Sequence, residues 1–351
     1  MRLGLNLGYW GGGNDAANLA LAREADRLGY AVVWAAEAYG SDAPTVLAWV
    51  AAQTERIDVG SAILQIPART PAMTAMTAAT LDTLSGGRFR LGLGVSGPQV
   101  SEGWHGVRFD RPLLRTREYV EIVRMALRRE RVRFEGEAYR LPLPDGPGKA
   151  LALTVHPVRD RIPVYLASVG PRNLELTGEI ADGWLPVFFA PGASSARESL
   201  DGIGVGLARA GRSWEGFDVV PTVPLVVGDD WVTCADAVRP YAALYVGGMG
   251  SRERNFYNDL AVRMGFGSAA ALVQDRFLAR DYVGAQAAVP LEFLDATSLL
   301  GPPGRIRDGM RAFADVGVTT LTVSPAGAGL DERIGALRVA AEALDAAGVA
   351  G

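Results

Sequence analysis

Short apolar runs alternate with longer amphipathic stretches from one end of the chain to the other. The runs predicted as strands cover residues 3–7, 31–35, 57–64, 89–93, 163–167, 184–188, 217–227 and 319–323. Helical spacing follows nearly every run, as in residues 15–28 and 115–129. Eight strands, nearly all followed by a helix, are the count of a (β/α)8 TIM barrel, which is the predicted α/β fold. A doubly wound open sheet is the alternative, because the same alternation produces it.

The chain is longer than a bare barrel, which predicts insertions. A bare barrel needs about 250 residues, whereas the chain has 351. The largest insertion is predicted at about residues 229–300, where helical patterns at 231–245, 253–265 and 268–280 stand in place of a single crossover helix. Residues 130–161 interrupt the alternation with prolines and glycines and are interpreted as a hairpin-like excursion. We therefore expect residues 1–351 to form a single barrel domain that carries a helical insertion.

The composition excludes several classes of function. The 35 basic and 39 acidic residues give a net charge of −4, which argues against nucleic acid or an anionic membrane as the main partner. One cysteine, Cys234, and two distant histidines, His105 and His156, exclude a disulfide framework and make a metal centre improbable. No apolar run approaches the roughly 18 to 20 residues that span a bilayer, and no secretion signal is evident. We therefore expect a cytoplasmic protein with no metal.

The glycines Gly92, Gly94 and Gly97 form a G-x-G-x-x-G pattern directly after the fourth predicted strand. A dinucleotide-binding motif of this kind opens a helix within the first βα unit. Here the pattern follows the fourth strand, and helical spacing begins only near residue 115. The glycines are therefore better explained as places where the backbone approaches a neighbour closely.

The carboxyl ends of the strands hold the candidate functional residues, because barrel active sites gather there. Glu37 follows the second strand and is either an acid facing a ligand or a solvated loop residue. The third strand ends in small residues followed by Gln65, which suits contact with a flat ligand or a buried strand before a proline turn. His105 lies in the loop after the fourth strand and is either a proton donor or a structural histidine.

Two further segments allow a functional and a structural interpretation. Ser168, Val169 and Gly170 precede a helix, so they form either an anion site or an ordinary serine N-cap. Residues 255–258 (NFYN) are either part of a lid over the substrate or the start of a helix. From the residues alone, the prediction is a barrel enzyme that binds a flat, anionic ligand at the carboxyl ends of its strands.

Several longer stretches are more specific than a general barrel pattern. They are residues 3–10 (LGLNLGYW), 33–40 (VWAAEAYG), 69–76 (RTPAMTAM), 81–99 (LDTLSGGRFRLGLGVSGPQ), 102–106 (EGWHG), 115–119 (RTREY), 181–184 (ADGW) and 255–260 (NFYNDL). Together they resemble the bacterial luciferase-like superfamily. The chain is most similar to the F420-dependent branch, within an actinobacterial subgroup of uncharacterised oxidoreductases.

The resemblance implies a (β/α)8 barrel that binds coenzyme F420, a deazaflavin, across the carboxyl ends of its strands. Glu37 matches the acid that faces the deazaflavin ring. Ala62 and Ile63 match a bulge in the third strand where family members hold a non-proline cis peptide behind the ring, and Gln65 matches the polar residue just after it. The remaining matched positions are Ser96, Gly97 and Val100 beside the ring edge, and Ser168, Val169 and Gly170 near the ribityl-phosphate arm.

The sequence departs from the sugar-phosphate dehydrogenases of this branch at Ala38, where they carry a histidine. Glu37, Tyr39 or His105 is therefore expected to supply the catalytic proton, unless solvent does. The implied reaction is hydride transfer between C5 of the deazaflavin and a small organic substrate, in a protein expected to be a homodimer. The alternatives are an FMN-dependent luciferase-like monooxygenase and a non-catalytic cofactor-binding protein.

Overall fold

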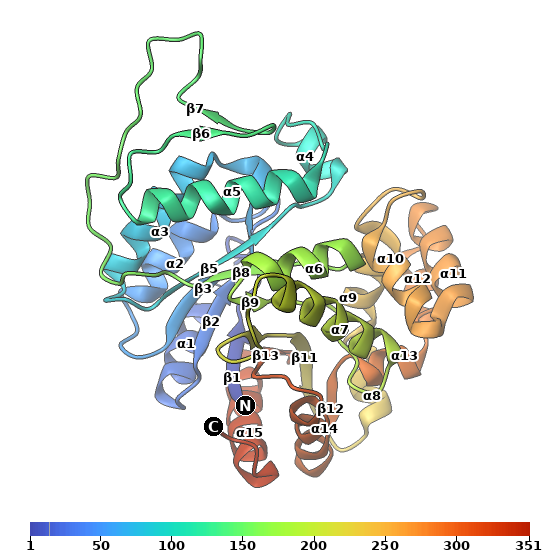
Figure 1. The fold of residues 1–351 in the computed structure, drawn as a ribbon. Helices are drawn as coiled ribbons and strands as arrows, with labels where there is room; N and C mark the ends of the chain where they lie inside the picture. The colour runs from blue at the N-terminus through green and yellow to red at the C-terminus, as the bar shows by residue number, and fades with distance from the viewer. Residues whose placement is uncertain (14) are drawn as a thin grey trace.

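Parallel strands lie at the centre of the molecule (Figure 1), and the order in which they pair makes a ring. The computed structural model describes residues 1–13 and 15–351. The order around the ring is β1, β2, β3, β5, β8, β9, β10 with β11, and β13. The ring closes at the seventh position: β10 pairs with β9, β11 pairs with β13, and only Val220 and Pro221 separate β10 from β11. The predicted (β/α)8 barrel is thus the observed fold.

The strands are β1 (Arg2–Asn6), β2 (Val32–Ala35), β3 (Asp58–Ser61), β4 (Leu64–Gln65), β5 (Phe89–Gly94), β6 (Phe134–Glu135), β7 (Arg140–Leu141), β8 (Val164–Ala167), β9 (Gly183–Trp184), β10 (Asp218–Val219), β11 (Thr222–Val227), β12 (Leu299–Gly301) and β13 (Thr320–Pro325). The barrel helices are α1 (Asp15–Arg27), α2 (Ala43–Ala51), α3 (Pro71–Leu84), α4 (Pro98–Gly103), α5 (Pro112–Leu127), α6 (Pro171–Ile180), α7 (Ser194–Arg209), α14 (Pro303–Asp315) and α15 (Leu330–Ala347). A 3₁₀ helix covers Ile66–Ala68.

Between β11 and β12 lies a group of short helices, which Figure 1 shows gathered to one side of the barrel. They are α8 (Trp231–Asp236), α9 (Arg239–Ala243), α10 (Phe256–Ala261), α11 (Gly267–Leu278), α12 (Tyr282–Ala287) and α13 (Leu291–Ala296), with π-helices at Leu244–Gly248 and Val262–Phe266. They bury their own apolar cluster, which includes Phe188 of the barrel and Phe293 of α13. This insertion does not replace the crossover helix as expected, because α14 follows it and leads into β13.

Other differences from the sequence prediction lie at strand ends. The third strand is split into β3 and β4. The glycine pattern after β5 does open a helix, the short α4, which the helical spacing did not reveal. Neither β12 nor α14 was predicted. The expected excursion contains the antiparallel hairpin β6–β7. Each miss involves an element whose pattern is short or is interrupted by glycine and proline.

Large rings fill the interior of the barrel. Trp34 on β2 meets Tyr165 on β8 edge to face, with ring centroids 5.4 Å apart. Gly60 makes room for them, because a Cβ there would lie 2.3 Å from the Trp34 ring. The same inner cluster continues to Ala62, Ile63 and Ala167. The barrel is therefore a packed core, and a ligand at its mouth rests on this layer.

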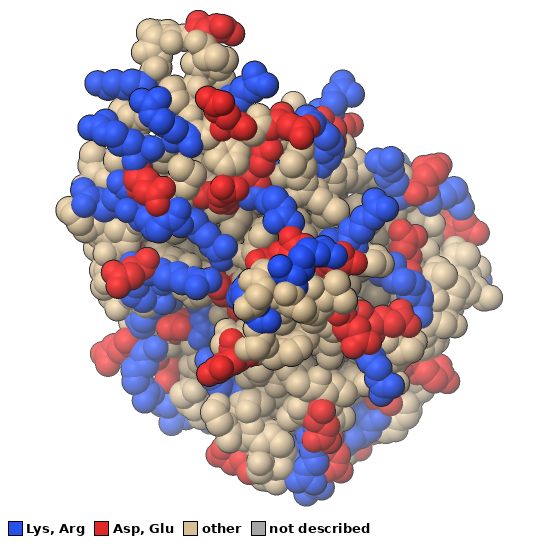
Figure 2. Space-filling model, in the orientation of Figure 1, with Lys and Arg blue, Asp and Glu red and all other residues tan. Residues whose placement is uncertain are grey.

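Basic and acidic side chains are intermixed over the face shown in Figure 2. Among the residues that the structure describes, no helix combines the length and the apolarity needed to cross a membrane. Within the same residues, no group of three or more histidine, cysteine or acidic side chains is placed to hold a metal ion.

Candidate active site

Glu37 lies just beyond the carboxyl end of β2 and pairs with an arginine. A guanidinium nitrogen of Arg69 donates to Glu37 Oε1 at 3.0 Å and to Asp42 Oδ1 at 2.5 Å. The Glu37 and Arg69 side chains are only 11% and 14% exposed. Two N-caps fix the geometry: Asp42 accepts from the Thr45 amide at the start of α2, and Thr70 starts α3 directly after Arg69. Glu37 is thus not a solvated loop acid.

The Glu37–Arg69 pair leaves polar atoms without a partner. Glu37 Oε2 and Arg69 Nε are buried, and neither has a hydrogen-bond partner among the described residues. Burial raises the pKa of the Glu37 carboxyl; the charge of Arg69 and its hydrogen bond oppose this shift, and Asp42 adds to it. An unpaired buried acceptor is costly unless something donates to it. Glu37 Oε2 can therefore accept a hydrogen bond from a bound molecule or hold a proton.

The third strand carries the predicted bulge. The peptide between Ala62 and Ile63 is cis, as the resemblance implied. Ser61, fully buried, donates to the Gly92 carbonyl at 2.8 Å and accepts from the Gly92 amide at 2.9 Å. A Cβ at Gly92 would lie 1.9 Å from the Ser61 carbonyl oxygen, and one at Gly94 would lie 2.9 Å from the Ile63 side chain. The glycine pattern therefore serves close approach between β5 and the bulge, as predicted.

Gln65 connects two of the other predicted site residues. Its Nε2 donates to Ser96 Oγ at 3.0 Å, and its Oε1 lies 2.8 Å from His105 Nε2. Since an amide oxygen only accepts, His105 carries a proton on Nε2 in this arrangement. Burial lowers the pKa of His105, so the ring is neutral at pH 7, with Nδ1 as its acceptor. The Val100 carbonyl accepts from the His105 amide at 3.1 Å, and this bond connects His105 to α4.

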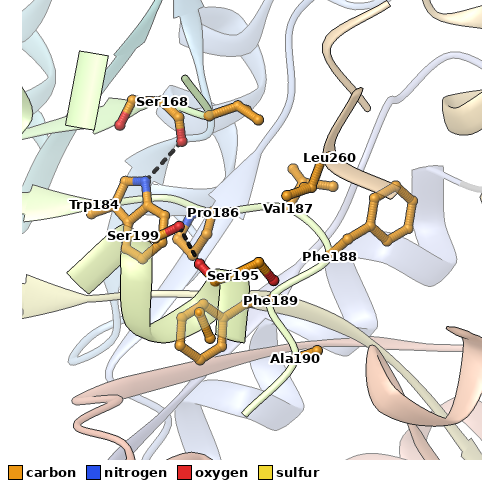
Figure 3. A pocket seen from close by; sticks show the side chains of 12 residues that line it. Ser168, Trp184, Pro186, Val187, Phe188, Phe189, Ala190, Ser195, Ser199 and Leu260 are labelled. Carbon is orange, nitrogen blue, oxygen red and sulfur yellow. Dashed lines mark hydrogen bonds between the residues drawn. The ribbon is translucent and has the colours of Figure 1, made fainter. Parts of the chain in front are cut away.

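The Ser168–Gly170 segment joins β8 to α6. The Ser168 hydroxyl is buried against Thr177 Oγ1 at 2.8 Å, and the Ser168 carbonyl accepts from Trp184 Nε1 at 2.9 Å. The N-cap of α6 is Gly170, without a capping side chain, so Ser168 is not the N-cap. Ser168 and Val169 line a narrow cavity with Trp184, residues 186–190, Ser195, Ser199 and Leu260 (Figure 3). The Ser168 hydroxyl is thus engaged by Thr177, within the wall of this cavity.

The predicted site residues thus fall into separate groups around the barrel mouth. Gln65, Ser96 and His105 form one hydrogen-bonded network, whereas Glu37 belongs to an ion pair with Arg69 and Asp42. Gly97 is the N-cap of α4, and Tyr39 is 62% exposed. Sequence reasoning missed Arg69 as the partner of Glu37, and Asp42 as the second carboxylate that accepts from Arg69. The signal was available for Arg69, which opens one of the family-like stretches, but a pairing 32 residues apart requires the tertiary fold.

Comparisons with known proteins place this barrel in a family. The family model described as luciferase-like monooxygenase matches residues 9–320. The chain belongs to the luciferase-like family, as its motifs predicted. It is 44% identical over 332 residues to a protein of Mycobacterium tuberculosis assigned as a coenzyme F420-dependent oxidoreductase, with 92% of this chain and 95% of the relative covered.

Two more distant relatives agree with this assignment. The 5,10-methylenetetrahydromethanopterin reductase of Archaeoglobus fulgidus is 29% identical, over 86% of this chain and 88% of the relative. The solved structure of the coenzyme F420-dependent tetrahydromethanopterin reductase from Methanopyrus kandleri superposes with a TM-score of 0.82, covers 97% of each chain and is 24% identical. That structural likeness establishes the fold.

Proposed function

We propose that this protein is an oxidoreductase that binds coenzyme F420 at the mouth of its barrel and catalyses hydride transfer between the deazaflavin C5 and a small organic substrate. The observation that carries the proposal is the buried, unpaired Glu37 Oε2 at the carboxyl end of β2. It supplies the acceptor that a ring N–H of the cofactor needs. The 44% identical relative from Mycobacterium tuberculosis supports the choice of F420.

The residues around the mouth fit such a cofactor. We assign the ring to the space between Glu37 and the Ala62–Ile63 bulge, where Ala62 offers no bulk to obstruct it. Gln65, Ser96, Gly97 and Val100 would border the ring edge. We assign the phosphate-bearing arm to Ser168, Val169 and Gly170, where the amides at the start of α6 favour an anion.

The bound cofactor supplies a hydride, that is, two electrons with one proton, at C5. Reduction of the substrate then needs one further proton, and oxidation releases one. When Oε2 does not accept from a ring N–H, Glu37 is suited to hold that proton there, because burial raises the pKa of its carboxyl. His105 uses Nε2 toward Gln65, which leaves Nδ1 as the acceptor nitrogen of the neutral ring, and the exposed Tyr39 follows Glu37 by two residues. These three side chains remain the proposed catalytic residues, and the homodimer remains a prediction.

Titration of the purified protein with F420 and, separately, with FMN tests the proposal. We expect F420 to bind in the micromolar range or tighter and FMN to bind much more weakly. Glu37→Ala should weaken F420 binding in a protein that circular dichroism shows to be folded. Tight FMN that copurifies from a host lacking F420 would instead identify an FMN-dependent monooxygenase.

A further inference from the structure

The amino end of the barrel interior, opposite the mouth, holds a network of charges whose centre is buried. Arg90 on β5 pairs with Asp58 on β3 at 2.7 Å and with Asp218 on β10 at 3.1 Å. Arg2 on β1 also reaches Asp218 at 3.1 Å. Two arginines thus balance two carboxylates, and each of the four residues is the first or second of its strand. The proposed cofactor contacts use none of these groups.

Tyr165 on β8 joins this network through its hydroxyl. The hydroxyl donates to Asp218 Oδ2 at 3.1 Å and accepts from Arg90 Nη1 at 3.2 Å. The other oxygen of the carboxylate, Asp218 Oδ1, accepts from Thr320 Oγ1 at 2.9 Å. Arg90, Asp218 and Tyr165 are all buried. Because both partners of the hydroxyl are charged, its hydrogen bonds are stronger than bonds between neutral groups, and they fix one end of the Tyr165 side chain.

The Tyr165 ring connects the network to Trp34 on β2. The two rings meet edge to face, with centroids 5.4 Å apart. Gly183 on β9 borders the Tyr165 ring so closely that a Cβ there would lie 2.4 Å from two of its carbons. Tyr165 is therefore enclosed by the network at its hydroxyl, by β9 along its ring and by Trp34, which leaves the ring little room to move.

Trp34 lies against the backbone of strand three, just before the bulge. A Cβ at Gly60 would lie 2.3 and 2.4 Å from two carbons of the Trp34 ring, which is fully buried. Two residues further on, Ala62 and Ile63 pack against the cluster that contains Trp34 and Tyr165, and both are only partly buried. The bulge therefore rests on the Trp34 ring from the side of the barrel interior.

We propose that Tyr165 is a positioning residue for the cofactor ring, and that it acts through Trp34 to set the position of the Ala62–Ile63 bulge. This inference rests on the proposed binding of F420 at the mouth. We call Asp218, Tyr165, Trp34 and Gly60 the supporting column. A protein interior is close-packed and transmits a displacement from one group to the next. A change at the Tyr165 hydroxyl therefore reaches the bulge without contact between Tyr165 and the ligand.

The affinity for a flat ring is sensitive to such a displacement. A gap of about 0.5 to 1 Å loses about a quarter to a half of a van der Waals contact. The charges at the base of the column suit this role better than a role in stability. A buried ion pair adds little net stability, because the desolvation of its charges offsets their attraction. Its hydrogen bonds to Tyr165 and Thr320 have defined directions, however, and so hold the column in one geometry.

Tyr165→Phe tests the hydroxyl while it keeps the ring. F420 affinity is measured by fluorescence titration well below the unfolding midpoint, in proteins that circular dichroism shows to be folded. We expect Tyr165→Phe to bind F420 about threefold or more weakly than the wild type. The absorption band of bound F420 should also shift relative to the wild-type complex, because the bulge contacts the ring.

Tyr30→Phe is the matched control for a lost buried hydroxyl. Tyr30 is buried, and its hydroxyl donates to the Leu337 carbonyl of α15 at 3.0 Å, away from the supporting column. Tyr30→Phe should lower the thermal midpoint and leave both the F420 affinity and the absorption band unchanged. An equal loss of F420 affinity in Tyr30→Phe and Tyr165→Phe would assign the effect to general destabilisation and overturn the inference.

Trp34→Phe tests whether Tyr165 acts through Trp34. The smaller ring removes support from the Gly60 backbone, so this variant should bind F420 at least as weakly as Tyr165→Phe. In the double variant, Tyr165→Phe should weaken binding no further, whereas independent sites would add. Additive losses overturn action through Trp34. Where Tyr165→Phe does not fold, Trp34→Phe decides alone, and wild-type affinity in that variant overturns the column.

The wild-type titration separates the two proposals. Wild-type protein that binds F420, together with a Tyr165→Phe variant of unchanged affinity and unchanged absorption band, overturns only the positioning role. Wild-type protein that fails to bind F420 refutes the proposed function, and the positioning role falls with it.

Discussion

Ser61 is the residue through which the stability of the strand-three bulge is best tested. Its hydroxyl is fully buried and makes two hydrogen bonds with the backbone of Gly92, at 2.8 and 2.9 Å. Ser61→Ala removes both and leaves a buried amide and a buried carbonyl without partners. At about 1 kcal/mol for each bond plus part of the desolvation cost, the expected loss of unfolding free energy is about 2–3 kcal/mol.

Thermal unfolding converts this loss into a measurable shift. An unfolding entropy of about 2.1 cal/mol/K per residue gives about 0.7 kcal/mol/K for this chain, so Ser61→Ala should lower the midpoint by about 3–4 °C. Ser199→Ala is the matched control, because its hydroxyl donates to the Ser195 carbonyl four residues earlier in α7 and joins no two segments of the barrel. A midpoint for Ser61→Ala within 1 °C of this control would refute the assignment of Ser61 as a support of the bulge.

Three further predictions concern the mouth of the barrel. Ala62→Trp fills the space assigned to the ring, so F420 affinity should fall at least tenfold in a titration while circular dichroism still shows a folded barrel; wild-type affinity would contradict this placement. Burial raises the pKa of Glu37, so the wild-type protein loses stability as the pH rises and the buried carboxyl ionises. Glu37→Gln cannot ionise, and its thermal midpoint should therefore increase relative to that of the wild type from pH 4 to pH 7. A constant difference would show that Glu37 is not desolvated. Because burial lowers the pKa of His105, wild-type protein should lose stability as the pH falls below about 6.5, and His105→Gln should lose less between pH 7.5 and pH 5. Parallel pH profiles of the two proteins would contradict a buried, neutral ring.

The family-like motifs singled out residues that the structure places at the carboxyl ends of the strands, but they did not reveal how these residues pair. The cis peptide at Ala62–Ile63 was implied by resemblance and is present in the structure. The Gln65–Ser96–His105 network was not predicted, although all three residues were singled out, because a side-chain hydrogen bond depends on distances that span the loop after β5.

The sequence by itself determined the alternation of strands and helices, because local spacing of apolar residues specifies each element, and the count of eight strands favoured a barrel over an open sheet. It also determined which polar residues lie at strand ends, since each of them comes directly after a predicted strand in the sequence. Only the tertiary structure decided that Arg69 neutralises Glu37 on one side and leaves Oε2 unpaired on the other. That result depends on contacts between segments whose separation along the chain has no periodicity, and on burial, which shifts the pKa of a carboxyl in a way that its place in the sequence does not reveal.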